Sequence, residues 1–501
     1  MTRVIIRADA GPSIGSGHLM RAAALAEALH RQGADVGVLA AGVPARTAAW
    51  LGELGMTSTM PPAVSPDSRD AEATIAAARN GDADARWVVV DGYHFESTYM
   101  NRLLDAGLRV AWVDDLNALP AYPADVVVNP TLGAERCAYR SGTGTRVLAG
   151  GTYAFLRAAF AEAAARRAAA DPQRIVIALG GADPGRLTPR VVRAVLDAAL
   201  HDARVTVVVG PSNPNVDDVR RAAAGADHVT VVQDPADWPG LLAGAALVIA
   251  AAGITTWELA ALGVPMLLIV AAENQARGAS AIAEADAAEV IRGDAAGDLE
   301  DLPARVAELW NNAGRRASMA ARARRLIDGR GASRVARWII DGAQLDRITL
   351  RAASREDAVQ VWRINSEPSV RAESFDDRPI LLGHHFDWFD NRLTSPTCRM
   401  SVLVREDEVA AIVRYDRLPD GDAAELGFAV ASPFRRLGLG SRVLAETWGA
   451  ACDELRVPAV RGFVIKGNDA SIGAFRRAGF NAVGSDMRAG RECLVFERRA
   501  A

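Results

Sequence analysis

Short runs of β-branched and other apolar residues alternate with longer amphipathic segments over the first two-thirds of the chain. Such runs are typical of strands that a parallel sheet buries on both faces. The first set comprises Val4–Arg7, Asp35–Ala40, Trp87–Val90, Arg109–Val113 and Asp125–Val128. Segments with apolar residues at helical spacing, such as Leu19–Arg31, lie between them. Strands that alternate with helices predict a parallel sheet with right-handed crossovers.

A second set of the same kind begins near Arg174. Its expected strands are Ile175–Leu179, Val205–Val209, Val229–Val232, Leu247–Ile249 and Met266–Val270. The stretch Ala158–Ala170 predicts a helix that joins the two sets, and Ala320–Ile340 predicts a helix that closes the second. Two such units in tandem predict two Rossmann-like domains facing a cleft, with ligands at the carboxyl ends of the strands.

The pattern changes after Arg347. The next expected elements are a strand, a helix and three further strands, at Ile348–Arg351, Arg355–Ile364, Arg399–Val404, Ala410–Asp416 and Glu425–Val430. The segment 341–344 is typical of a linker. We therefore expect an α/β chain of three domains, over residues 1–165, 166–342 and 347–498. The length of 501 residues agrees, because one domain usually holds roughly 150 residues.

Composition narrows the class of protein. The net charge of −4 argues against non-specific nucleic-acid binding. The four cysteines form no CxxC pair, so zinc sites and dithiol redox chemistry have no support. Charges at Arg3, Arg7 and Asp9 interrupt the apolar stretch that a signal peptide would need. The most apolar window, Leu241–Ile254, is too short to span a bilayer. We expect a cytoplasmic protein with neither a nucleic-acid nor a membrane partner.

A glycine-rich loop joins the first expected strand to the first expected helix. Residues 14–21 read Ile-Gly-Ser-Gly-His-Leu-Met-Arg. Glycines let the backbone approach a ligand closely, and a helix N-terminus offers unpaired N–H groups to an anion. Imidazole has an unperturbed pKa near 6.5, so His18 is suited to take a proton from water. The alternative is a strand-to-helix turn in which His18 only caps or packs.

Further segments occur in order around this loop. They are Arg7–Ala10, Asp91–His94, Trp112–Leu116, Gly151–Arg157, Leu179–Pro184, Thr255–Glu258 and Ala272–Gln275. Together with the loop they resemble the UDP-sugar hydrolases of pseudaminic acid biosynthesis, which are GT-B-fold relatives of the nucleotide-sugar glycosyltransferases. The resemblance covers roughly residues 1–340. It implies inverting hydrolysis of UDP-2,4-diacetamido-2,4,6-trideoxy-β-L-altrose to UDP and the free sugar.

The same resemblance implies site residues. His18 falls on the catalytic histidine of the family. The implied substrate-binding residues are Gly15, Gly17, Arg21, Asp91, Tyr93, Gly180, Gly181, Thr255, Thr256, Glu258, Asn274 and Gln275. Glu258 would bind the ribose, and the helix start at Thr255 would face the phosphates. Ala252 and Ile254 depart from the glycine and threonine usual in the family, and the alternative is an ordinary capped helix.

Metal chemistry has little support in the sequence. The acidic pairs Asp82/Asp84 and Asp114/Asp115 are the candidate ligands, but no second cluster completes a coordination shell. UDP is a good leaving group near neutral pH. The reaction therefore needs a positioned water, a base and stabilisation of the growing diphosphate charge. We expect no metal cofactor.

A second glycine-containing loop follows the expected strand Glu425–Val430. Residues 435–441 read Arg-Arg-Leu-Gly-Leu-Gly-Ser and open a helix, so successive N–H groups can cradle a pyrophosphate. With Ile465–Ile472 and Phe475–Phe480, this loop resembles the GNAT-superfamily N-acetyltransferases over about residues 347–498. The resemblance implies acetyl-CoA as cosubstrate. The residues implied to bind it are Val430, Arg435, Arg436, Gly438, Leu439, Gly440, Ser441 and Asn468.

The acceptor side of this domain is less defined. Glu425 is the candidate general base, and the alternative is a glutamate that faces solvent. Neither Phe475 nor Arg476 is the tyrosine that many relatives use as general acid, so no general acid is assigned. Residues 363–365, Arg371 and residues 387–389 also resemble sugar-amine acetyltransferases, although core packing is the commoner explanation of aromatic residues such as Trp388 and Phe389.

The two resemblances together predict a bifunctional enzyme. One half would acetylate the 4-amino group of a UDP-linked altrose, and the other would release UDP from the product. One alternative is a GT-B glycosyltransferase fused to an acetyltransferase of another amino sugar or of protein N-termini. Another is a nucleotide-sugar sensor in which His18 only orients the ligand.

Overall fold

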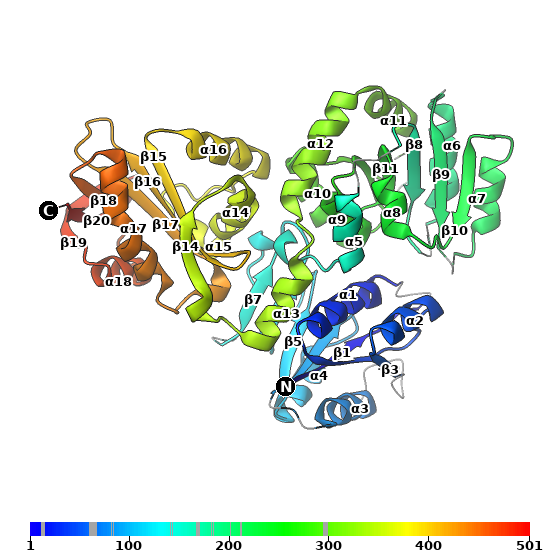
Figure 1. Ribbon diagram of the computed structural model, residues 1–501, viewed down its shortest axis with the longest axis horizontal. Coiled ribbons are helices and arrows are strands. Elements are labelled where there is room, and N and C mark those ends of the chain that lie inside the picture. Colours follow the sequence, from blue (N-terminus) through cyan, green and yellow to red (C-terminus); the bar gives the residue numbers. More distant parts are fainter. Residues whose placement is uncertain are drawn as a thin grey trace. The chain divides into compact units, whose positions relative to one another are not determined.

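The computed structural model describes the whole chain except residues 12–15, 60–67, 82, 84, 141, 143, 167–170, 182, 184, 201, 211–212, 294–298 and 501. The chain forms two compact units (Figure 1). The first comprises residues 1–134 and 139–340, and the second comprises residues 135–138 and 341–501. The three domain ranges expected from the sequence stay a prediction.

The first sheet of the first unit has seven parallel strands in the order β3-β2-β1-β4-β5-β6-β7. The strands are β1 (Thr2–Ala8), β2 (Asp35–Leu39), β3 (Thr57–Thr59), β4 (Ala85–Asp91), β5 (Arg109–Val113), β6 (Val126–Asn129) and β7 (Arg146–Ala149). The helices between them are α1 (Gly17–Arg31), α2 (Ala45–Glu53), α3 (Ser68–Arg79) and α4 (Ser97–Asp105). The strand order reverses between β1 and β4, where doubly wound sheets bind ligands.

The second sheet of this unit has six parallel strands in the order β10-β9-β8-β11-β12-β13. The strands are β8 (Arg174–Ala178), β9 (Arg204–Val209), β10 (Val229–Gln233), β11 (Leu247–Ala251), β12 (Met266–Val270) and β13 (Glu289–Arg292). The helices are α5 (Ala158–Ala165), α6 (Leu187–Asp197), α7 (Val216–Ala223), α8 (Trp238–Ala243), α9 (Ile254–Leu262), α10 (Ala276–Glu284), α11 (Leu302–Asn311), α12 (Ala313–Leu326) and α13 (Gly331–Asp341). Its order reverses between β8 and β11.

The expected strands of both sheets are confirmed to within two residues at each end. The expected single helix Ala320–Ile340 is wrong, because α12 ends at Leu326 and α13 begins at Gly331. Gly329 lies between them with φ +77°, a left-handed conformation that ends a helix. The joining helix α5 ends at Ala165, and residues 167–170 of the expected helix lie outside the described residues.

The second unit is built on one mixed sheet in the order β14-β15-β16-β17-β18-β20-β19. The strands are β14 (Ile348–Ala352), β15 (Cys398–Arg405), β16 (Glu408–Arg417), β17 (Ala424–Val430), β18 (Ala459–Ile465), β19 (Asn481–Arg488) and β20 (Arg491–Arg499). The helices are α14 (Ala358–Ser366), α15 (Pro368–Ala372), α16 (Leu382–Thr394), α17 (Leu439–Leu455) and α18 (Asp469–Arg477). All strand pairs are antiparallel except β17 with β18.

Helices cover both faces of the mixed sheet. The guanidinium of Arg414 on β16 lies over the Trp388 ring of α16, while the hydroxyl of the next residue, Tyr415, bonds that of Thr447 on α17. Successive strand residues point to opposite faces, so α16 and α17 lie on opposite faces. The parallel pair β17 and β18 is registered only from Ala424 to Leu426. Beyond that point β17 continues toward Val430 without β18 as a partner, so the sheet opens there.

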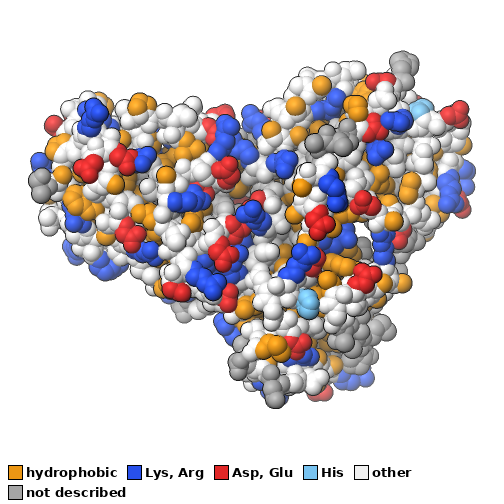
Figure 2. All heavy atoms as spheres, viewed as in Figure 1, with side chains coloured by type: hydrophobic (Ala, Val, Ile, Leu, Met, Phe, Trp, Pro, Cys, Tyr) orange, Lys and Arg blue, Asp and Glu red, His pale blue; other side chains and the backbone are white. Residues whose placement is uncertain are grey.

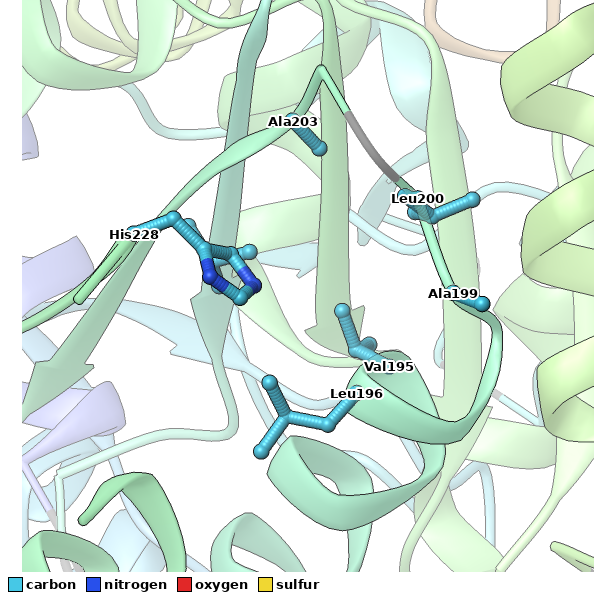
Figure 3. Close-up of a pocket in the computed structure, with 7 residues that line it drawn as sticks. Val195, Leu196, Ala199, Leu200, Ala203 and His228 are labelled. Atoms are coloured by element: carbon cyan, nitrogen blue, oxygen red, sulfur yellow. The ribbon is translucent and has the colours of Figure 1, made fainter. Parts of the chain in front are cut away.

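The surface carries charges of both signs. On the face shown in Figure 2, Lys and Arg side chains are interspersed with Asp and Glu. None of the described helices is long and apolar enough to cross a membrane. A cavity of about 250 Å³ is lined by apolar residues, such as Leu196 and Leu200, and by His228 (Figure 3). It adjoins Ala203 and Val205 at the start of β9, at the opposite end from the ligand edge of that sheet.

Candidate functional site

The predicted residues of the first unit gather at the two points where strand order reverses. His18 follows β1 at the start of α1, and Asp91 is the last residue of β4. Gly180 and Gly181 follow β8, and Gly253 precedes α9 directly after β11. Because the carboxyl ends of parallel strands share one sheet edge, each group forms one cluster. Gly15 lies outside the described residues.

The two clusters face each other within the first unit. A Cβ atom at Gly17 would lie 3.3 Å from Ile254 Cδ1, and one at Gly181 would lie 3.5 Å from the Ser16 hydroxyl. The N-terminus of α1 therefore approaches the N-terminus of α9 and the loop after β8. Helix N-termini carry partial positive charge and unpaired N–H groups, so this convergence suits an anionic diphosphate.

His18 is paired with a buried carboxylate. Its Nδ1 lies 2.7 Å from Asp91 Oδ1, and Asp91 is completely buried. Arg21, one turn along α1, donates from Nε to Asp91 Oδ2 (2.6 Å) and from Nη2 to Asp91 Oδ1 (2.7 Å). Burial alone would raise the pKa of Asp91, but the charge and hydrogen bonds of Arg21 and His18 lower it to about 2. Asp91 is therefore ionised at neutral pH.

The ionised carboxylate sets the tautomer of the imidazole. An ionised carboxylate only accepts hydrogen bonds, so the proton between Asp91 and His18 belongs to Nδ1. In the neutral ring, Nε2 is then the unprotonated nitrogen. Arg21 Nη2 lies 3.0 Å from the same Nδ1 and bonds Asp91 instead. This arrangement fixes the orientation of the His18 ring against a buried carboxylate, and the catalytic role of His18 stays a prediction.

Arg21 has a different set of contacts from the substrate contacts that the resemblance implies. Its Nη1 donates to Asp115 Oδ2 (2.6 Å), so Nε and both terminal nitrogens bond protein carboxylates. Burial alone would lower the pKa of Arg21, but Asp91 and Asp115 raise it, so its charge is permanent. The geometry indicates that Arg21 holds Asp91 in place. The sequence had offered Asp115 only as a metal ligand.

Tyr93 connects this cluster to the second sheet. Its ring meets the His18 ring edge-on, with centroids 4.5 Å apart. Its hydroxyl donates to Asp115 Oδ2 (3.2 Å) and accepts from Asn274 Nδ2 (3.0 Å). Burial and the Asp115 carboxylate raise the pKa of Tyr93 to about 12, so the phenol keeps its proton. Arg277 on α10 donates to the carbonyl of Asp115 (3.0 Å), so a second bond joins the two sheets.

The remaining predicted residues surround the start of α9. Gln275 Oε1 accepts from the Ala271 N–H (2.9 Å), and its Nε2 lies 3.9 Å from where a Cβ of Gly253 would be. Thr256 is buried, and among the described residues its hydroxyl oxygen has no hydrogen-bond partner. Thr255 is half-buried at the first turn of α9. An unpaired buried hydroxyl at a helix start is suited to a ligand oxygen.

Glu258 has a partner that sequence reasoning missed. The Trp238 indole on α8 donates to Glu258 Oε2 (2.9 Å). Burial raises the pKa of Glu258, although the Trp238 hydrogen bond and the charge of Arg157 oppose the shift. One carboxylate oxygen is held by the indole. The Thr255 side chain also hydrogen-bonds this carboxylate, and the expected ribose contact stays a prediction.

A second buried network lies beside Asp91. Arg7 on β1 donates to Asp70 through Nε (3.0 Å) and Nη2 (2.8 Å) and to Asp9 through Nη1 (2.5 Å). His94 Nε2 lies 3.0 Å from the other oxygen of Asp9. The through-space pairing of Asp9 with His94 leaves no local sequence signal, so it could not be expected.

The buried carboxylates predict acid sensitivity. Burial alone would raise the pKa of Asp9, but hydrogen bonds from His94 and Arg7 lower it to about 2, as for Asp91. Because these folded-state pKa values lie below the unfolded value near 3.9, the stabilisation is full above pH ~4 and is lost as pH falls toward 2. Between pH 5 and pH 3, each carboxylate should cost about 1 kcal/mol of unfolding free energy.

Urea unfolding followed by circular dichroism at pH 5 and pH 3 measures this loss. Asp9→Asn should flatten the pH dependence, since it removes one titrating group. Asp217→Asn, at an exposed position on α7, is the matched control and should leave the dependence unchanged. An equal slope in Asp9→Asn and the unsubstituted protein would contradict the assignment.

In the second unit, the predicted acetyl-CoA loop leads directly into α17. Gly438 has φ +81° and precedes the helix, and the Ser441 hydroxyl donates to its carbonyl (2.9 Å). Arg436 is also left-handed, with φ +63°, and is exposed. Leu439 is buried, and a Cβ at Gly440 would lie 3.1 Å from the Phe428 ring. The turn therefore fixes the N–H groups at the start of α17 beside the opening of β17.

Arg435 and Asn468 are engaged within the unit. Arg435 Nε donates to the Val430 carbonyl (3.0 Å), and its Nη2 pairs with Glu367. Burial raises the pKa of Glu367, although Arg435 and Arg363 oppose the shift. Asn468 Oδ1 accepts from the Ser471 N–H (3.0 Å) and caps α18. The geometry thus indicates that Arg435 shapes the loop, and the cofactor contacts of both residues stay predictions.

Glu425 is ion-paired. Arg488, the last residue of β19, donates from Nη1 to both carboxylate oxygens at 2.8 Å. Glu425 is half-buried and does not simply face solvent. Its role as a base stays a prediction. Among the described residues, no group of three or more His, Cys, Asp or Glu side chains is arranged to hold a metal ion. Asp82 and Asp84 lie outside that set.

Comparison with known proteins gives a domain match in each unit. Residues 175–335 match the Glycosyltransferase family 28 C-terminal domain, and residues 347–481 match the Acetyltransferase (GNAT) domain. The chain is 28% identical over 232 residues to the spore coat polysaccharide biosynthesis protein SpsG of Bacillus subtilis (strain 168), over 45% of this chain and 68% of that protein.

Two further matches concern the first unit. Over 132 residues the chain is 34% identical to the UDP-N-acetylglucosamine--N-acetylmuramyl-(pentapeptide) pyrophosphoryl-undecaprenol N-acetylglucosamine transferase of Exiguobacterium sp.. That match covers 25% of this chain and 36% of that protein. The crystal structure of MurG from Acinetobacter baumannii is 18% identical, covers 68% of this chain and 99% of its own, and has a TM-score of 0.46.

The expected fold class is confirmed. The chain has GT-B-like Rossmann-type parallel sheets, with a glycosyltransferase-28-type C-terminal domain, followed by a GNAT acetyltransferase domain with a mixed sheet. The chain therefore carries a match to a glycosyltransferase family 28 domain followed by a match to a GNAT domain, and the reactions of the two units stay predictions.

Proposed function

We propose that the first unit hydrolyses a UDP-linked diacetamido sugar to UDP and the free sugar, and that the second acetylates the amino precursor of that sugar. The proposed substrate is UDP-2,4-diacetamido-2,4,6-trideoxy-β-L-altrose. The single observation that carries the hydrolase is the pair of His18 with the buried Asp91, held at 2.7 Å opposite the start of α9. No metal is needed in this scheme.

The hydrolytic step follows from the tautomer of His18. Nε2 takes a proton from water while the water oxygen attacks the anomeric carbon. The bond between that carbon and the diphosphate oxygen breaks, and UDP leaves as an anion. One displacement inverts the anomeric centre. Asp91 stabilises the imidazolium that forms, as a buried carboxylate does in hydrolytic triads. The start of α9 and the Gly180–Gly181 loop would receive the growing phosphate charge.

The acetyl transfer uses the second unit. The acceptor ammonium loses a proton to Glu425, and the neutral amine attacks the thioester carbonyl of acetyl-CoA. The C–S bond breaks, and CoA leaves as a thiolate that takes up the second proton lost by the nitrogen. The turn at residues 435–441 would hold the pyrophosphate of the cofactor. Acetylation precedes hydrolysis in this scheme, because the acceptor is the UDP-linked amino sugar and UDP is released only from its acetylated product. Fusion of the two domains raises the local concentration of the shared intermediate.

A second candidate for the first unit is glycosyl transfer. The identity to the Exiguobacterium transferase and the family 28 match favour it. In that case His18 would take the proton of an acceptor hydroxyl in place of water. The hydrolase is favoured here because the motifs from Arg7 to Gln275 follow the order of the UDP-sugar hydrolases.

One incubation tests both halves. The protein is mixed with the UDP-linked 4-amino sugar, with and without acetyl-CoA, and products are followed by mass spectrometry. We expect the acetylated UDP-sugar first and then UDP with free diacetamido sugar, without any added acceptor. Acetylation without UDP release, together with UDP release on adding an acceptor alcohol, would support the transferase. If no UDP is released in any mixture while the nucleotide binds, the protein is a sensor.

A further inference from the structure

A carboxylate and an aromatic ring meet where β17 and β18 separate. Glu425 belongs to the last registered part of the two strands, and Phe463 is the first residue of β18 beyond it. Between them lies the guanidinium of Arg488. Its Nη1 is 2.8 Å from both Glu425 oxygens, and its Cζ is 3.2 Å from the centre of the Phe463 ring. This trio was not expected from the sequence beyond Glu425 itself.

A carboxylate beside an aromatic face is a site for a cation. The carboxylate supplies a charge-assisted hydrogen bond, and the ring face attracts positive charge. The side chains of Arg488 and Glu425 keep 30% and 34% of their surface exposed, so an incoming ligand can reach the pair. The occupant in this structure comes from the chain itself.

We propose that Glu425 and Phe463 form the site for the ammonium group of the acceptor, and that Arg488 fills this site until the acceptor arrives. The proposal rests on the acetyltransferase function above and concerns how the amino acceptor of that function is bound and what occupies its site beforehand. Arg488 then competes with the acceptor for one carboxylate. Arg488 thereby selects among acceptors, because only an acceptor with a cationic group can displace the guanidinium from Glu425.

Arg488 can leave without a change in the sheet. It ends the edge strand β19, beside the hairpin turn of Ala489 (φ +48°) and Gly490 (φ +75°). Only its side chain needs to move, and half-exposed ion pairs contribute little to stability. A second carboxylate is near, since Asp486 Oδ2 lies 3.6 Å from Arg488 Nε. The guanidinium therefore keeps a partner after release.

Displacement frees the atoms that the reaction needs. With Arg488 bound, both oxygens of Glu425 are engaged. Once the acceptor ammonium replaces it, one oxygen takes a proton from that ammonium. The neutral nitrogen then attacks the thioester carbonyl and the C–S bond breaks. The departing thiolate takes up the second proton, which the nitrogen loses on forming the amide.

The test is the effect of Arg488→Ala on acceptor KM. CoA release is followed with a thiol reagent, with the UDP-linked 4-amino sugar as acceptor. We expect acceptor KM to fall about fivefold while KM for acetyl-CoA is unchanged. Arg488→Gln, which keeps a polar side chain but removes the charge, should act in the same direction if Arg488→Ala folds poorly. Arg499→Ala is the control, since Arg499 pairs with Glu497 at the far end of the hairpin.

A second readout needs no acetyl transfer. Thermal unfolding is measured with increasing glucosamine, whose ammonium group serves as probe. Arg488→Ala should gain a glucosamine-dependent rise in Tm larger than that of the unsubstituted protein, and Arg488→Ala/Glu425→Gln should lose it. A higher acceptor KM in Arg488→Ala, or no gain in glucosamine binding, would overturn the proposal. Gain of binding without acetylation of any amine would overturn the proposed function alone.

Discussion

His18→Asn is expected to lower kcat for UDP release about 1,000-fold, because general-base catalysis contributes roughly 10²–10⁴ and an amide cannot take up the proton. The substituted side chain still offers an N–H to Asp91, so the buried carboxylate keeps a donor there in addition to Arg21. The measurement is UDP release from the diacetamido sugar nucleotide at saturating substrate. Acetyl transfer should stay within twofold, since His18 belongs to the other unit.

The same helix supplies the control for this prediction. His30 lies exposed near the end of α1, so His30→Asn makes the same chemical change away from the cluster and should leave UDP release intact. UDP affinity, measured by calorimetry, should change little in His18→Asn. Retention of a tenth or more of the activity would show that another group takes the proton. Loss of UDP binding would show that His18 holds the nucleotide.

Gly438→Val is expected to lower acetyl transfer roughly 100-fold while UDP release is preserved. A β-branched residue at φ +81° is strained, so the turn that opens α17 must shift. A shift near 1 Å in groups that position a substrate costs on the order of 100-fold in rate. The measurement is CoA release at fixed acceptor with increasing acetyl-CoA. We expect the larger part of the effect in KM for acetyl-CoA, since the turn would hold the cofactor.

Gly421→Val separates this local effect from backbone strain in general. Gly421 has φ +76° in the connection between β16 and β17, and its nearest neighbour is the far end of the Arg417 side chain. Its strain is therefore comparable, but it lies outside the 435–441 turn. Equal loss of acetyl transfer in both variants would mean that Gly438 acts through stability alone.

Hydrophobic patterning was enough to predict the central strands of both parallel sheets. Buried strands such as β12 are runs of five apolar residues, and their short length and flanking turn residues distinguish them from buried helices. The edge strand β3 reads Thr-Ser-Thr, and β13 begins and ends with a charge, so neither carries that signal. Edge strands are buried less, and their pairing is decided by the neighbouring strand rather than by their own residues.

The candidate site also has one part that could be predicted from the sequence and one part that could not. Loops such as residues 14–18 could be identified because glycine next to a strand and a helix is a local signal. The ion pairs that give these residues their roles are not local. Arg21 and Asp115 are 94 positions apart in the sequence, and nothing in the residues around one indicates that the other will be its partner. Arg488 was missed for that reason, since its partner Glu425 lies 63 positions before it.

The hydrogen bond between Asn274 and Tyr93 makes the surroundings of His18 depend on how the two sheets of the first unit are placed. Asn274 belongs to the sheet that carries α9, whereas Tyr93 borders the imidazole on the other sheet. If the two sheets part to admit a nucleotide, that hydrogen bond breaks and the Tyr93 hydroxyl keeps only its hydrogen bond to Asp115. His18 itself stays paired with Asp91 on its own sheet, so parting of the sheets would release the phenol ring beside the imidazole and not the imidazole. Opening would therefore change the wall of the site next to His18 while leaving the pairing of His18 with Asp91 unchanged.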